Sequence, residues 1–168
     1  FLKLKSFSLP KDKINIFIPL FFIFLIFCQI CVGAFVSGMD AGKIYNSWPL
    51  MGTNYFPDDN HFSNLFNFAA LSDPSLVQFI HRNLAYLILI YYLIIFFLVY
   101  KKKLSSLFYT VNIIGVLLFL QIILGILTLI NGAQIFLASM HQISSIFLLS
   151  ISVYFLYLNS NTSSQLSN

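Results

Sequence analysis

Residues 77 to 86 read Val77-Gln78-Phe79-Ile80-His81-Arg82-Asn83-Leu84-Ala85-Tyr86 and place a histidine and an arginine at the start of a long apolar run. From residue 83 to residue 100 there is no Lys, Arg, Asp or Glu. Such a run is typical of a membrane-spanning helix, in which an unpartnered imidazole is costly to bury. His81 is therefore a candidate functional residue, and the question is what it binds.

A second histidine lies in a similar position, because residues 136 to 145 read Phe136-Leu137-Ala138-Ser139-Met140-His141-Gln142-Ile143-Ser144-Ser145. If the two helices begin near Leu76 and Phe136, each histidine lies five residues in, at the same depth of about 7.5 Å. A small side chain follows four residues later, Ala85 in one helix and Ser145 in the other. It leaves room for a bulky flat ligand on the same helix face. The pattern predicts a haem held between the two histidines.

The composition is that of an integral membrane protein. Of the 168 residues, 59% are hydrophobic and 8% charged, and the mean hydropathy of +0.88 lies outside the usual range of soluble domains. The net charge of +4 comes from lysines that flank the apolar runs. It therefore indicates membrane topology, and we expect no nucleic-acid partner. The chain begins with Phe1 rather than Met, and we interpret it as part of a longer protein.

The apolar runs predict an all-α membrane protein, a bundle of four transmembrane helices in up-down-up-down order over residues 14–158. The helices are expected at about 14–38, 75–100, 106–130 and 136–158, each long enough to span a hydrocarbon core of about 30 Å. Asp73 and Pro74 have the form of an N-cap followed by proline at the first helical position. Three lysines at 101–103 mark the inner side. The basic linker of residues 1–13, the polar tail of residues 159–168 and both termini are therefore expected on that side.

A long outer loop, residues 39–74, is predicted between the first two helices. It contains four Asp, one Lys and several turn-forming Gly and Pro residues. Apolar residues between Leu65 and Leu71 suggest a short amphipathic segment that lies on the membrane or over the mouth of the bundle as a lid. We expect Tyr45 and Trp48 to be interfacial anchors and His61 to be a solvated surface residue.

The two hairpins contain an internal repeat, since Gln29-Ile30-Cys31-Val32-Gly33 parallels Gln121-Ile122-Ile123-Leu124-Gly125. In the predicted order the two histidine helices are diagonal, with axes about 12 to 14 Å apart, a gap that two imidazoles and one metal would fill. Each Gln and Gly, four residues apart, share a helix face that would let a planar ligand approach closely. The alternative for the glycines is ordinary packing of small residues between helices.

Other interpretations of the polar residues stay open. The two histidines could be unrelated and separately hydrogen-bonded, whereas zinc would require further ligands, and no third His, Cys or carboxylate is expected at this depth. Arg82 either contacts a haem propionate at the outer mouth or extends to lipid headgroups. Cys28 and Cys31 fall inside the first apolar run, where buried packing thiols are a better interpretation than a redox motif.

With these residues the chain resembles haem A synthase, specifically the C-terminal half of that family, over about residues 25–150. The loop motif is the specific part of the resemblance, whereas the His-Arg and His-Gln pairs alone would be weak. The motifs are Gly33-Ala34-Phe35-Val36-Ser37-Gly38-Met39-Asp40-Ala41-Gly42-Lys43-Ile44-Tyr45-Asn46-Ser47-Trp48-Pro49, Gln78-Phe79-Ile80-His81-Arg82, Gln121 to Gly125, and His141-Gln142.

The resemblance implies a protein of eight helices in two pseudo-symmetric halves, each with a histidine pair. It implies that the N-terminal half binds the haem O substrate, while the C-terminal half carries a haem b whose ligands match His81 and His141. In the substrate half, a glutamate implicated in catalysis typically precedes the first histidine by three residues. This chain has Gln78 at that position and no Glu anywhere. We therefore expect no catalytic residue and no methyl-oxidising centre in this half.

For the whole enzyme, the resemblance implies oxidation of a haem O methyl group to the formyl group of haem A, which feeds cytochrome oxidase assembly. This half would relay electrons. The implied partners are the missing N-terminal half, haem O, haem O synthase and lipid of the bacterial cytoplasmic or mitochondrial inner membrane. Two other classes remain. One is a non-enzymatic b-type cytochrome subunit, against which the specific loop argues, and the other is a cofactor-free transporter or assembly scaffold, which would not depend on the histidines.

Overall fold

Four long helices make up most of the chain. The structure, a computed structural model, describes residues 13–161, so nearly all of the predicted basic linker and the end of the predicted polar tail lie outside it. The helices are α1 (Phe17–Gly38), α2 (Pro74–Lys101), α3 (Ser105–Ile130) and α4 (Ile135–Asn161). All four are long and apolar enough to cross a membrane. For the described residues, the predicted all-α fold with four membrane-length helices is confirmed.

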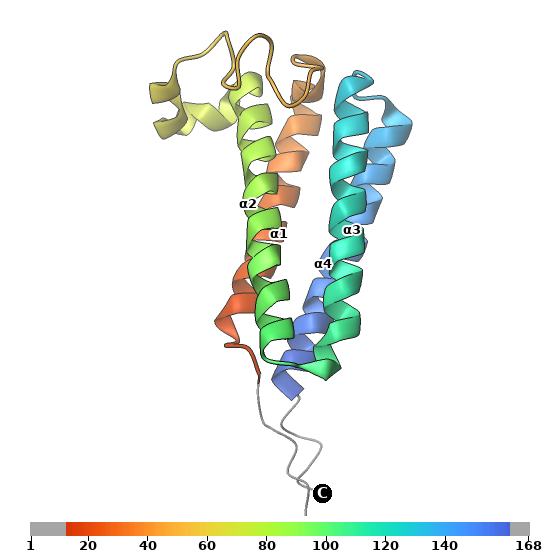
Figure 1. The fold of residues 1–168 in the computed structure, drawn as a ribbon. Helices are drawn as coiled ribbons and strands as arrows, with labels where there is room; N and C mark the ends of the chain where they lie inside the picture. The colour runs from red at the N-terminus through yellow and green to blue at the C-terminus, as the bar shows by residue number, and fades with distance from the viewer. Residues whose placement is uncertain (1–12, 162–168) are drawn as a thin grey trace, which may run out of the picture.

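The helices form a bundle in which consecutive helices run in opposite directions (Figure 1). α1 packs against α2 and α4, and α3 packs against the same two helices, so that α2 and α4 stand diagonally. Phe22, Ile95, Ile114 and Phe155 are among the apolar side chains buried between them. Many other apolar side chains are exposed on the outside of the bundle, as expected for helices that face lipid.

Two helix ends differ from the sequence-based expectation. α1 begins at Phe17 rather than near residue 14, and α4 continues to Asn161, past the expected start of the polar tail at residue 159. The reason is that Asn159 is fully buried and exchanges two hydrogen bonds with the backbone of Ile14. A buried polar side chain with satisfied hydrogen bonds extends the helix, although its polarity suggested a tail.

The start of α2 follows the predicted capping pattern. The carboxylate of Asp73 accepts a hydrogen bond from the backbone N–H of Leu76 at 3.0 Å, and Pro74 occupies the first helical position. This cap fixes where α2 begins. It thereby fixes the depth of His81, the eighth residue of the helix.

The outer loop connects α1 to α2 and contains three short 3-10 helices, η1 (Ala41–Lys43), η2 (Phe62–Phe66) and η3 (Phe68–Ser72). Residues 44–60 run across the outer ends of the first two helices, while η2 and η3 project sideways from the start of α2 (Figure 1). The apolar segment therefore lies beside α2 and not over the mouth of the bundle, and its contact with the membrane stays a prediction. The ring of Phe68 is fully exposed there, and that of Phe66 is 80% exposed.

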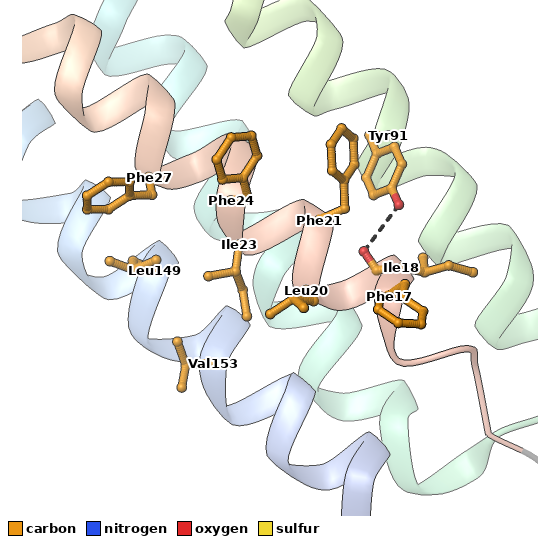
Figure 2. Close-up of a pocket in the computed structure, with 10 residues that line it drawn as sticks. All are labelled: Phe17, Ile18, Leu20, Phe21, Ile23, Phe24, Phe27, Tyr91, Leu149 and Val153. Atoms are coloured by element: carbon orange, nitrogen blue, oxygen red, sulfur yellow. Dashed lines mark hydrogen bonds between the residues drawn. The ribbon is translucent and has the colours of Figure 1, made fainter.

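An apolar groove lies between α1, α2 and α4, near the start of α1 (Figure 2). Phenylalanine side chains of α1 form much of its wall, and the hydroxyl of Tyr91 donates to the carbonyl of Ile18 at its edge. Its lining residues are Phe17, Ile18, Leu20, Phe21, Ile23, Phe24, Phe27, Tyr91, Leu149 and Val153. The candidate site residues are not among them, so the groove is separate from the histidine pair.

Candidate functional site

The rings of His81 and His141 face each other across the bundle. His81 comes from α2 and His141 from the diagonal helix α4, with ring centroids 6.4 Å apart and ring planes at 80°. Two imidazoles that share a metal, with a metal–nitrogen bond of about 2 Å on each side, have centroids about 6 Å apart. The observed separation is therefore compatible with two imidazoles that hold one metal.

The two repeated glycines lie against the histidine rings. A Cβ atom built on Gly33 would lie 3.2 Å from Cε1 of His81, and one built on Gly125 would lie 3.1 Å from Cε1 of His141. Both distances are tighter than ordinary packing, so each ring would have to shift by a few tenths of an ångström to admit even a methyl group. The glycines thus allow each ring to approach the first helix of its own hairpin, where we had expected room for a planar ligand.

The two repeated glutamines bind the same histidine residues. Nε2 of Gln29 donates to the backbone carbonyl of His81 at 3.1 Å, and Nε2 of Gln121 donates to that of His141 at 3.0 Å. Each bond joins the two helices of one hairpin in a partly buried position, so it fixes the rotation of one helix against the other. The Gln-Gly repeat in the sequence therefore corresponds to a structural repeat that positions each histidine.

Several buried polar atoms around the rings have no hydrogen-bond partner among the described residues. They are Nδ1 of His81, Nδ1 of His141, Oε1 of Gln29, Oε1 of Gln78 and Nε of Arg82. Each unsatisfied atom costs about 1 to 3 kcal/mol, and such atoms are rare in native interiors. Their concentration beside paired imidazoles fits a site that takes a ligand.

The donor set favours a metal that brings most of its own ligands. Within residues 13–161, no group of three or more His, Cys, Asp or Glu side chains is placed to hold a metal ion. A structural or catalytic zinc site normally uses at least three protein ligands, whereas a haem needs only the axial ones. The residues present therefore fit haem and do not fit zinc.

Arg82 binds the outer loop. Its guanidinium donates to three backbone carbonyls, those of Ser47 at 3.0 Å, Tyr45 at 3.1 Å and Leu50 at 3.3 Å. Of the two roles that the sequence left open, extension to lipid headgroups does not agree with these contacts. Contact with a haem propionate remains a prediction. Gln78 adds a further bond to the carbonyl of Tyr45, at 3.1 Å.

The same loop also reaches the second hairpin. Nδ2 of Asn46 donates both to the carbonyl of Gly42 and to that of Leu129 near the end of α3, each at 2.9 Å. The indole N–H of Trp48 donates to the hydroxyl of Tyr86 in α2 at 3.1 Å. The loop segment from Tyr45 to Leu50, which we call the roof, is thus fastened to both hairpins at the histidine end of the bundle.

Two aspartates hold the rest of the loop in shape. Partial burial by itself would raise the pKa of Asp59, but hydrogen bonds from Ser75 at 2.6 Å and Tyr45 at 2.9 Å outweigh it and lower the pKa. The backbone N–H of Thr53 and the amide of Asn54 likewise lower the pKa of Asp58. Both carboxylates are therefore charged hydrogen-bond acceptors at neutral pH.

The remaining predicted residues are less directly involved. Ala85 is half-buried in α2, and the hydroxyl of Ser145 bonds the carbonyl of Gln142 within α4. Sequence reasoning missed Ser144, which is buried, accepts from Gln121 and donates to the carbonyl of His141 at 3.1 Å. Its position three residues after His141 was the available signal.

Fold and site together define a class, that of membrane-embedded four-helix bundles with a histidine from each of two diagonal helices meeting near one end. A family model described as cytochrome oxidase assembly protein (COX15-CtaA) matches residues 7–153. The chain therefore belongs to this family, to which its haem A synthase relatives also point, and the predicted resemblance is confirmed.

Curated relatives named haem A synthase match most of the chain. The protein of Pelagibacter ubique (strain HTCC1062) is 44% identical over 159 residues, which cover 95% of this chain and 46% of the relative. That of Rickettsia prowazekii (strain Madrid E) is 37% identical over 154 residues, 90% of this chain and 46% of the relative. That of Rickettsia akari (strain Hartford) is 40% identical over 157 residues, which cover 89% of this chain and 45% of the relative.

The chain thus spans about half the length of the curated relatives that it matches. No solved structure matches it.

Proposed function

We propose that the chain is the C-terminal half of a haem A synthase and that it holds one haem b between His81 and His141. The observation that carries the proposal is the 6.4 Å separation of the two ring centroids in a chain of this family. When bound, the haem supplies one-electron transfer. The rest of the site holds the two imidazoles and excludes water.

Each part of the site has a distinct role in this proposal. His81 and His141 would hold the haem iron, each through a neutral imidazole. Gly33 and Gly125 let the rings seat against the bundle, and the roof covers the outer side. Nε of Arg82 is buried and unpartnered among the described residues, so it is the atom of that side chain best placed to meet a propionate.

The methyl-oxidising chemistry belongs to the other half. No Glu occurs in this chain, and the amide of Gln78, at the position of the family's catalytic glutamate, is bonded to the carbonyl of Tyr45. In the proposed whole protein, this half relays electrons for the oxidation, in the N-terminal half, of a haem O methyl group to the formyl group of haem A. Its partners are that half, haem O, haem O synthase and lipid of an inner membrane, with both termini on the inner side.

A reduced-minus-oxidised spectrum of the purified chain tests the haem site. We expect a low-spin b-type signal in the unchanged chain and its loss in the double variant His81→Ala, His141→Ala. A signal that persists in the double variant would sink the proposed ligands. The assay for the enzymatic role is conversion of haem O by the chain expressed with and without the N-terminal half. A chain that never supports conversion would instead be a b-type cytochrome subunit.

A further inference from the structure

The two repeated glutamines are not equivalent. Besides its bond to the carbonyl of His81, Nε2 of Gln29 lies 3.2 Å from Nε2 of the His81 ring. Nε2 of Gln121 also makes two contacts, but both point away from the ring of its histidine, to the carbonyl of His141 and to the hydroxyl of Ser144. Among the described residues, only the first of the two histidine rings is thus contacted by the side-chain amide of its glutamine, whereas the ring of His141 has the backbone carbonyl of Gln121 as an acceptor.

The contact with His81 determines where its ring proton lies. The carbonyl oxygen of His81 can only accept, so the Gln29 atom 3.1 Å away must be the amide NH2 group. A rotated amide would place two acceptor oxygens against each other. The same NH2 group then faces Nε2 of the ring, and this nitrogen must be the acceptor. The proton of the neutral ring therefore lies on Nδ1.

Nδ1 itself does not alter this conclusion. It is buried and has no partner among the described residues, so it would be unsatisfied with or without its proton. The hydrogen bond from Gln29 is accordingly what separates the two tautomers of His81. The ring of His141 receives no such bond from a glutamine amide within the described chain, because Ser144 takes the second N–H of Gln121, and the Gln121 backbone carbonyl near this ring can only accept.

We propose that Gln29 is a positioning residue that holds His81 in the Nδ1–H tautomer and occupies its Nε2 lone pair until a metal takes it. This extends the proposed function, on which its metal-binding part rests. When Nε2 of His81 becomes a metal ligand, one N–H of Gln29 leaves the lone pair and the other stays on the carbonyl of His81. His141 offers its lone pair without this competition, so the two axial ligands are inequivalent.

The proton position can be tested without any cofactor. In the haem-free full chain with ¹⁵N-labelled histidine, imidazole ¹⁵N chemical shifts distinguish Nδ1–H from Nε2–H, and variants of His61 and His141 assign the His81 signals. We expect Nδ1–H for His81 in the unchanged chain, mixed tautomers in Gln29→Leu and no change in the matched variant Gln121→Leu. If the proton of the His81 ring lies on Nε2 in the unchanged chain, the proposal is overturned. This part of the test does not depend on whether the variants fold.

The competition with the metal can be tested by haem titration. In a His141→Ala background, where His81 alone holds the iron, Gln29→Leu should tighten haem binding about three- to tenfold, because a hydrogen bond no longer has to break. The other bond of Gln29, to the carbonyl of His81, is present both with and without bound haem. It therefore does not contribute to the difference in haem affinity. In a His81→Ala background, Gln121→Leu should not tighten binding.

Unchanged or weaker binding in Gln29→Leu, or equal tightening by both variants, would overturn the inference. A chain that binds no haem in any background would instead overturn the proposed function, and the tautomer result would stand by itself.

Discussion

Asn159 and Ile14 exchange two hydrogen bonds at the end of the bundle opposite the histidines, with the Ile14 N–H donating to Oδ1 at 3.0 Å and Nδ2 donating to the Ile14 carbonyl at 2.9 Å. Both residues are buried, so removing the side chain leaves a backbone donor and acceptor unsatisfied. We expect Asn159→Ala to lower the free energy of unfolding by about 2 to 4 kcal/mol, measured by denaturation in mixed detergent micelles. The neighbouring variant Ser160→Ala removes only a bond within α4 and should change it by less than about 0.5 kcal/mol. Equal effects would contradict this role of Asn159.

The glycines beside the histidine rings give a second prediction. Gly33→Ala would place a methyl group 3.2 Å from Cε1 of His81, so the ring must move from the position that it shares with His141. Overpacking of this kind costs about 1 to 3 kcal/mol, and we expect haem affinity to fall about tenfold or more in a Soret titration. Gly38→Ala is the matched control, because nothing lies within 4 Å of its added Cβ. Equal affinity in the two variants would show that the ring position is not critical.

The attachment of the roof to Arg82 predicts a change in protease sensitivity. Lysine keeps the positive charge but lacks the planar guanidinium group that donates to three carbonyls at once. Arg82→Lys should therefore loosen the loop. Lys43 provides the only tryptic site between residues 39 and 73. We expect cleavage after Lys43 to become about tenfold faster or more, measured by mass spectrometry of limited digests. Asn112→Ala, which removes a contact with Tyr100 at the other end of α2, should leave the rate unchanged.

The charge of Asp59 predicts a pH dependence of the same loop. The pKa of this carboxyl is lower in the folded loop than its ordinary value near 4, because Ser75 and Tyr45 donate to the carboxylate. Its contribution to stability is therefore complete above pH about 4 and is lost as the pH falls through the lower folded value. Trp48 is the single tryptophan, so its fluorescence reports this transition. Because hydrogen bonds in the loop also lower the pKa of Asp58, the acid transition should weaken in Asp59→Asn and in Asp58→Asn and disappear when both are changed.

The sequence was sufficient to predict the four helices and the pairing of the histidines. Uncharged runs long enough to span the membrane core are compatible with few folds other than a helical bundle. His81 and His141 lie at similar depth in two diagonal helices, which brings their rings together. The Gln-Gly repeat was recognised, but the contact of each glycine with a histidine ring was not, because it depends on helix rotation and not on spacing. Close approach of a planar ligand to the same helix faces stays a prediction.

Other contacts depend on geometry that the sequence does not contain. Ser144 and Ser145 are adjacent serines, and only the rotation of α4 decides that the first of them joins Gln121. Asn159 looked like part of a tail because its partner, Ile14, is 145 residues away. The path of the outer loop was equally hidden, so the carbonyls that bind Arg82 could not be named in advance.

The bond from Asn46 to the carbonyl of Leu129 has a consequence for biogenesis, because the two residues are 83 positions apart. During synthesis, α1, the loop and α2 emerge before α3, so we expect the roof to be held by α2 alone until the third helix has entered the bilayer. A chain that stops before residue 105 should accordingly be cut after Lys43 faster than the full chain. The histidine site would then be most accessible to its cofactor while the nascent protein is only partly inserted in the membrane.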